Sequence, residues 1–191
     1  LEALLPDSAL RRRIAIPDRI RLRGTAGADK GAFSAASTLS TDGGEIALQG
    51  RLDTRSEAYG IELRCDSFPL NSFLPADSLG LLDLALQAGG SGFDPLRAQT
   101  RGNIRLQVDR AEFRGRDFGG VKLNANLEGG QLSGRLSDRD EALRLLLLIS
   151  GTLTERKQEV RLTGNVFDFD LAELGISPQK IGGSFALEAG A

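Results

Sequence analysis

Apolar and polar residues alternate along most of the chain. In residues 59–65, tyrosine, isoleucine, leucine and cysteine occupy every second position, with glycine and charged residues between them. This period of two is typical of a β-strand that has one apolar and one polar face. Similar segments recur up to residue 189, at the spacing of about 8–14 residues that hairpin-connected strands show. The pattern therefore predicts an all-β protein with a long, curved, mostly antiparallel sheet.

Short sequences rich in glycine separate these segments. Glycine readily adopts the positive φ that tight hairpins require, so the sequences are interpreted as turns. They lie at residues 42–44, 89–92, 119–120, 128–130 and 182–183. The alternation also breaks at residues 68–75 and 170–175, where bounding prolines in one case and capping residues in the other predict a helical turn. The sheet is therefore expected to carry one or two short helical turns.

One part of the sequence recurs 101 residues later. Residues 50–70 and 151–171 are identical at five of 21 positions, and the apolar phase is kept at others. The same offset aligns apolar positions from about residue 20 to residue 89. An internal repeat of this kind indicates similar units stacked into one extended structure.

This repeat sets the expected domain organisation. Residues 1–13 form an N-terminal flanking segment, and residues 14–191 form one continuous β-groove. The groove is expected to consist of two repeat units, at approximately 14–115 and 116–191, of which the second is truncated.

The residue types that most catalytic and metal sites need are scarce. The chain has no histidine, and its one cysteine, Cys65, can form neither an internal disulfide nor a metal site alone. Residues 138–140 and 168–170 each hold two nearby aspartates, but at positions next to turns, where aspartate is common. No serine lies in a Gly-x-Ser-x-Gly motif, and residues 89–92 lack the lysine of a phosphate-binding loop. The sequence predicts no enzyme, no cofactor and no metal site.

Charge and hydropathy argue against two further classes. The 24 basic and 26 acidic residues are interspersed, with a net charge of −2, so we expect no nucleic-acid partner. The longest aliphatic run, residues 145–149, is far shorter than the ~20 residues of a membrane-spanning helix. Membrane contact is therefore expected only through parts of a longer protein that lie outside this sequence.

The alternation predicts one apolar face that runs through every strand. Such a face is either the closed core of a sandwich or barrel, or the open lining of a groove. The repeat favours the groove, because stacked units extend a groove whereas a sandwich closes on itself. An aliphatic lining without polar anchors suits flexible acyl chains, which gain about 0.8 kcal/mol per buried methylene. The candidate groove-lining residues are Ile20, Leu22, Ile46, Leu48, Tyr59, Ile61, Leu63, Leu84, Leu86, Leu123, Leu147, Ile149, Val160 and Leu162.

Four stretches of the chain carry a resemblance to a known family. They are residues 16–24, 43–52, 65–75, and 79–89 with 92–95. Together they resemble the AsmA/TamB superfamily of Gram-negative envelope proteins, whose members have a long half-barrel sheet, or β-taco. The resemblance implies a periplasmic protein anchored in the inner membrane that moves phospholipid to the outer membrane. It also implies a part in assembling outer-membrane β-barrel proteins with an Omp85-type partner.

Three functions remain open from the sequence. The first is a segment of a periplasm-spanning lipid conduit that supports outer-membrane assembly. The second is a chaperone-like trough that holds unfolded β-strands of barrel precursors and offers free sheet edges. The third is a structural β-sandwich stalk or adhesin module, in which the apolar face is a closed core.

Overall fold

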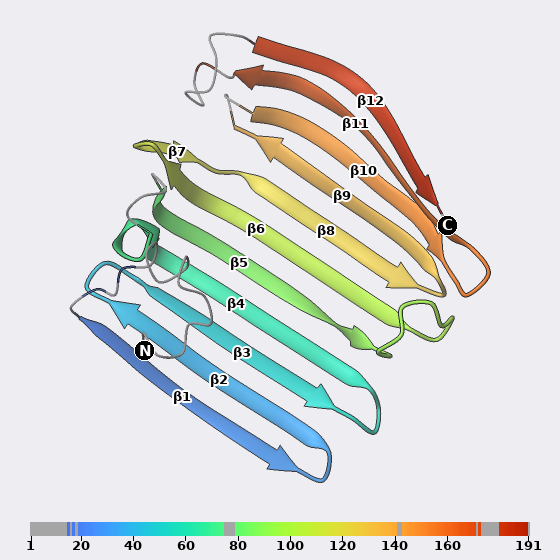
Figure 1. The fold of residues 1–191 in the computed structure, drawn as a ribbon, viewed down its shortest axis with the longest axis horizontal. Coiled ribbons are helices and arrows are strands. Elements are labelled where there is room, and N and C mark those ends of the chain that lie inside the picture. Colours follow the sequence, from blue (N-terminus) through green and yellow to red (C-terminus); the bar gives the residue numbers. More distant parts are fainter. Residues whose placement is uncertain are drawn as a thin grey trace.

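All the described strands belong to one antiparallel sheet (Figure 1). The computed structural model describes residues 19–74, 79–140, 143–170 and 180–190, together with Ala15, Pro17 and Ala172. The sheet has 12 strands, and consecutive strands pair in chain order from β1 to β12, except that β7 pairs with β6 beside the path. The strands are β1 (Ile20–Asp29), β2 (Ala32–Thr41), β3 (Glu45–Asp53), β4 (Ala58–Pro69), β5 (Leu79–Ser91), β6 (Arg101–Phe113), β7 (Arg116–Phe118), β8 (Val121–Glu128), β9 (Gln131–Arg139), β10 (Leu143–Leu153), β11 (Gln158–Asp170) and β12 (Lys180–Gly190). The prediction of an all-β fold with one long, curved antiparallel sheet is confirmed.

A single helical turn interrupts the described strands. The 3-10 helix η2 (Leu70–Ser72) follows β4, as the proline-bounded break at residues 68–75 predicts. The rings of Phe68 and Phe73 stack beside it with centroids 5.1 Å apart. The Ala15 N–H donates to the Phe73 carbonyl oxygen at 2.7 Å, which places Ala15 at this end of the sheet. Most of the second predicted turn, at residues 170–175, lies outside the described residues.

Tight turns at glycine set the hairpins. Lys30–Gly31, Arg114–Gly115 and Gly129–Gly130 each have positive φ at both residues, as type I′ turns require. The predicted turns at residues 42–44 and 119–120 lie between strands, and the one at 128–130 starts at the last residue of β8, as expected.

One predicted turn is wrong and another is wrong in most of its length. Residues 182–183 lie inside β12, and residues 89–91 lie inside β5, so that of the turn predicted at 89–92 only Gly92, with a φ of 85°, lies beyond the strand. At Gly90, a Cβ would come within 2.1 Å of the Arg101 carbonyl oxygen and 2.8 Å of the Tyr59 hydroxyl. Glycine at this position therefore permits a close approach within the sheet, whereas the sequence pattern suggested a bend.

β-Bulges disturb the ladder at one end of the sheet. The β4–β5 register shifts between Cys65 and Phe68, and Ser67 at this bulge has a φ of 48°. The β11–β12 register shifts between Val166 and Phe169, which lie 101 residues further along the chain. The bulge therefore recurs at the offset that the sequence repeat shows.

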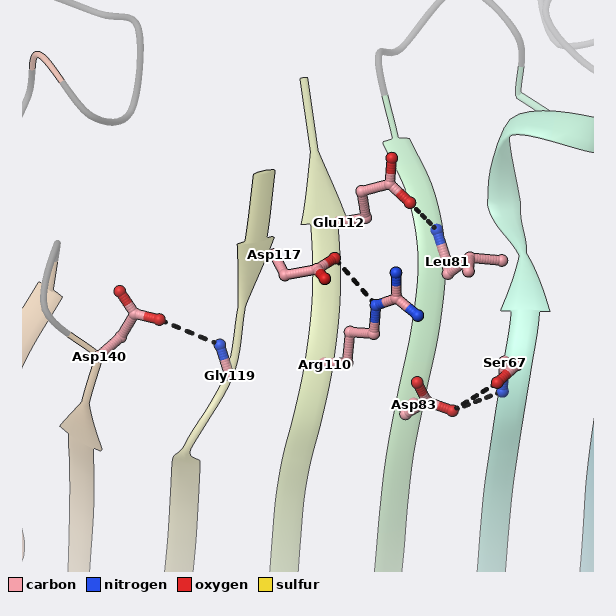
Figure 2. Close-up of polar contacts among 8 residues, drawn as sticks. All are labelled: Ser67, Leu81, Asp83, Arg110, Glu112, Asp117, Gly119 and Asp140. Atoms are coloured by element: carbon pink, nitrogen blue, oxygen red, sulfur yellow. Dashed lines mark hydrogen bonds and ion pairs between the residues drawn. The ribbon is translucent and has the colours of Figure 1, made fainter. Parts of the chain in front are cut away.

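Carboxylates compensate for the disturbed backbone (Figure 2). Asp83 accepts hydrogen bonds from the backbone N–H and the hydroxyl of Ser67. Glu112 accepts from the Leu81 N–H at 3.2 Å. Asp140 accepts from the Gly119 N–H at 3.4 Å. Acidic side chains thus satisfy N–H groups at or beside irregular parts of the ladder, where an unpaired donor would be costly.

The two halves of the sheet share a further backbone hydrogen bond. The Thr54 N–H donates to the Gly31 carbonyl oxygen at 2.9 Å, and the Leu153 N–H donates to the Gly130 carbonyl oxygen at 2.7 Å. In each half, this bond joins the first hairpin turn to the end of the third strand. The registers differ by two residues, because Leu52 pairs with Tyr59 whereas Leu153 pairs with Gln158. A two-residue difference keeps every side chain on the same face. The division into two repeat units stays a proposal that these parallels support.

The described residues contain almost no conventional core. Cys65 and Phe68 are the only buried hydrophobic residues among them. No described side chain is less than 2% exposed. The sheet is therefore a single layer over the described part of the chain, with its apolar side chains half-buried by their own neighbours.

Candidate functional site

The cross-strand register places all the predicted groove-lining residues on one side of the sheet, which we call the apolar face. Direct cross-strand partners point to the same face, and so do residues two apart on one strand. These two relations connect the candidates from β1 to β11. They lie on β1 (Ile20, Leu22), β3 (Ile46, Leu48), β4 (Tyr59, Ile61, Leu63), β5 (Leu84, Leu86), β8 (Leu123), β10 (Leu147, Ile149) and β11 (Val160, Leu162).

A row of leucines crosses the middle of the apolar face. Each leucine is the direct partner of the next one on the neighbouring strand, from β3 to β10. Strands lie about 4.8 Å apart, so the row spans roughly 29 Å at right angles to the strands. The row consists of Leu48, Leu63, Leu86, Leu106, Leu123, Leu136 and Leu147. The apolar face is therefore continuous across strands and is not a series of separate patches.

The apolar face remains open to solvent. Among the predicted residues, Leu22 is 68% exposed, Leu48 38% and Ile61 40%, and none of the others is buried. A half-exposed leucine or isoleucine gains about 1 kcal/mol when its remaining surface is covered. The face can therefore bind an apolar partner by the hydrophobic effect alone.

Sequence reasoning missed two strands that contribute to this face. β2 adds Phe33 and Leu39, and β9 adds Leu132 and Leu136. The β2 sequence AFSAASTLST consists mainly of small residues, so its alternation has little contrast. In β9, Gly134 stands between the two leucines and hides the period of two. The faint signal that remains is that Phe33 and Leu39, and likewise Leu132 and Leu136, keep an even spacing.

Two titratable groups on the apolar face are buried at one end of it. Asp138 is 4% exposed, and burial raises the pKa of its carboxyl, while the Asp140 N–H donates to it at 2.9 Å. Cys65 is also 4% exposed. Burial raises the pKa of its thiol, and the charges of Asp66 and Asp83 add to this rise. Cys65 therefore serves as a small packed residue at this end, and neither group has the exposure that a reactive centre needs.

The opposite face is polar and carries exposed ion pairs. Arg110 donates to Asp117 at 2.8 Å, and this hydrogen bond raises the pKa of the guanidinium further above its usual range. Arg101 lies 3.6 Å from Glu128. The alternation fails in β10, where Leu148 is 49% exposed and lies on the polar face because Leu147 and Ile149 lie on the apolar one. The polar face as a whole therefore has the charged, exposed side chains of a surface that faces water.

Other kinds of site find no support among the described residues. No cluster of three or more His, Cys, Asp or Glu residues suited to a metal ion occurs among the described residues. Within the same part of the chain, no helix has the length and hydropathy needed to cross a membrane. Comparison of the chain with protein-family models, with curated proteins and with solved structures finds no match.

Proposed function

We propose that this chain is a segment of a periplasm-spanning envelope protein whose apolar face conducts phospholipid acyl chains toward the outer membrane and supports outer-membrane assembly. The observation that carries the proposal is the continuous apolar face, which crosses the strands from β1 to β11 and is left open by the described residues. Monomeric proteins rarely expose contiguous apolar patches of this extent unless the patches bind something. The resemblance to the AsmA/TamB superfamily supports the periplasmic location, an inner-membrane anchor elsewhere in the protein and an Omp85-type partner.

The direction of the leucine row suits transport along the sheet. The row runs at right angles to the strands, so adding further strands lengthens it without changing its character. The row consists of one aliphatic residue type and has no charged or hydrogen-bonding side chain. An acyl chain therefore meets similar surroundings at every strand, and no position on the row holds it much more tightly than the next.

The backbone hydrogen bonds of the sheet, which are already formed between strands, favour lipid over polypeptide as the cargo on this face. Each strand from β2 to β6 and from β8 to β11 pairs on both sides, so its N–H and C=O groups are engaged within the sheet. A polypeptide lying on the face would bring its own N–H and C=O groups to an apolar surface without partners. Each such group costs about 1–3 kcal/mol when it is buried. An acyl chain has no such groups.

A second candidate function draws on the edges of the sheet. β1 and β12 each pair on one side only among the described strands. The β1–β2 register is regular over all ten residues of β1, with no bulge or proline to block addition of a strand. An open edge of this kind can hold an unfolded strand of a barrel precursor. The sandwich alternative has less support, because the described strands form one sheet.

Photo-crosslinking in cells tests the proposal. A photoreactive amino acid at Leu48 or Ile149, in the full-length protein, should capture phospholipid. The matched controls are Gln49 and Ser150, the next residues on the same strands, which lie on the polar face. Capture of barrel precursors instead of lipid would favour the chaperone function. Equal capture at all four positions, or capture at none, would contradict both.

A further inference from the structure

A hollow of about 590 Å³ lies over β1 to β4 on the apolar face. Its floor consists of Ala26, Ala35 and Gly50, which are direct partners in one row across β1, β2 and β3. Phe33 and Ile61 border the hollow and are 47% and 40% exposed. The hollow thus combines a floor of small residues with large apolar side chains that stand open beside it.

The depth of the hollow depends on the glycine at position 50. A Cβ built at Gly50 meets no atom of a described residue within 4 Å, so the described part of the chain leaves the space above this backbone position empty. In the second half of the sheet, the corresponding row on β8, β9 and β10 reads Ala125, Gly134 and Ile149. An isoleucine therefore occupies the third place of that row, where the first half of the sheet has glycine. The two halves differ in a residue that determines whether the row is filled.

We infer that this hollow is a subsite that seats part of an unbranched hydrocarbon chain. The inference rests on the proposed function, and it names one location and one shape of ligand on the apolar face. On one side the floor meets the row that contains Phe33 and Leu52, and on the other side it meets Leu48. Residues two apart on a strand are separated by roughly 7 Å, so the floor has about the width of a single polymethylene chain.

The chemistry of the hollow selects against a polypeptide. The side chains of its floor and walls on the apolar face are uncharged, whereas Arg51, which also borders the hollow, belongs by alternation to the opposite face. β2, β3 and β4 are paired on both sides, so no backbone donor or acceptor of these strands is left for a bound peptide. The free N–H and C=O groups of β1 lie in the plane of the sheet at its edge, so they serve a strand added beside the sheet and not a peptide lying in the hollow. A hydrocarbon chain requires neither charge nor hydrogen bonds, and it gains free energy with each methylene that leaves water.

Fluorescence titration with cis-parinaric acid, an unbranched 18-carbon fatty acid, tests the inference. Gly50→Ile fills the hollow in the way that Ile149 fills its counterpart, and Ala35→Leu fills it from the next strand. Gln49→Ile is the matched control, because it places the same side chain on the opposite face of the same strand. We expect both filling variants to bind at least about tenfold more weakly than the wild type, since several methylene contacts are lost, and the control to bind as the wild type does.

The outcomes separate this inference from the proposed function. Binding by the wild type with unchanged binding by Gly50→Ile and Ala35→Leu would overturn the subsite and leave the proposed function standing. No binding by the wild type would overturn both. Circular dichroism checks that each variant folds, and Ala35→Leu carries the test if Gly50→Ile does not fold.

Discussion

Thr54 donates both its backbone N–H, at 2.9 Å, and its hydroxyl, at 3.0 Å, to the carbonyl oxygen of Gly31, 23 residues earlier in the chain. Gly31 has a φ of 91°, and a Cβ there would come within 2.8 Å of the Thr54 hydroxyl oxygen. Glycine is therefore required for both the turn and the contact. The bonds join the β1–β2 turn to the β3–β4 turn and fix the end of the sheet at which these two turns meet.

Replacing this threonine tests the contribution of the contact to stability. Thr54→Val keeps the shape and the backbone N–H but removes the hydroxyl donor. We expect the free energy of unfolding in urea to fall by about 1 kcal/mol, the typical net contribution of one hydrogen bond. Thr152→Val is a suitable control, because Thr152 lies within β10 and is paired in the ladder with Gln131 and Glu159. An equal loss in both variants would show that the hydrogen bond to Gly31 contributes no more to the free energy of unfolding than a threonine within a strand does.

A pair of truncations tests whether the sheet is a single layer. Phe68 is 3% exposed, so Phe68→Ala should cost about 3–5 kcal/mol, as in an ordinary core. Leu48 is 38% exposed, so Leu48→Ala should cost about 1 kcal/mol because much of its surface already meets water. Chemical denaturation of both variants provides the comparison. A cost of several kcal/mol at Leu48 would mean that another part of the protein covers the apolar face.

The fold was largely predictable from the sequence because one signal dominates it. Period-two alternation identifies the strands that carry large aliphatic residues, and a proline-bounded break identifies the turn at η2. The pattern fails where side-chain size does not contrast, as in β2. It also fails where glycine serves close packing, since Gly90 looks like a turn residue but lies inside β5 beside Tyr59.

The common face of the candidate site was predictable, but its detailed shape was not. Even spacing along the strands is enough to place Leu48 and Ile61 on one face. The hollow depends on which residues are direct partners, and this register is set by turn lengths and bulges. The sequence offset aligns Gly50 with Gly151, whereas in the cross-strand rows the place of Gly50 corresponds to that of Ile149. No alternation pattern contains that two-residue difference.

The thiol of Cys65 provides a test of local burial. Burial raises its pKa, and the nearby carboxylates of Asp66 and Asp83 raise it further, so less reactive thiolate is present at a given pH. We expect iodoacetamide to modify Cys65 much more slowly in the native protein at pH 8 than in the protein unfolded by urea. Because this is the only cysteine, mass spectrometry of the intact chain measures the rate directly. Similar rates in the two states would contradict the packing at this end of the apolar face.

The buried carboxyl of Asp138 makes stability depend on pH. Its pKa is raised in the native state, so the native protein retains this proton to higher pH than the unfolded chain does. The stability that wild type has relative to Asp138→Asn therefore falls as pH rises from the ordinary aspartate pKa through the raised one. An asparagine oxygen can still accept from the Asp140 N–H. We expect similar unfolding free energies at a pH below the ordinary aspartate value, and a more stable Asp138→Asn variant at pH 7. An Asp138→Asn variant that is less stable than the wild type, by the same amount at pH 7 and at low pH, would contradict this account.

Contact between an acyl chain and the apolar face can be measured without changing the protein. Tyr59 is the only tyrosine, the chain has no tryptophan, and the tyrosine ring lies on the apolar face near Phe93. Tyrosine fluorescence therefore reports from this face alone. Fatty acid with bromine on its acyl chain should quench the emission on titration, whereas the same fatty acid without bromine should not. Emission that is unaffected by the brominated chain, at concentrations where the fatty acid is shown to bind, would contradict the claim that the apolar face carries the acyl chain.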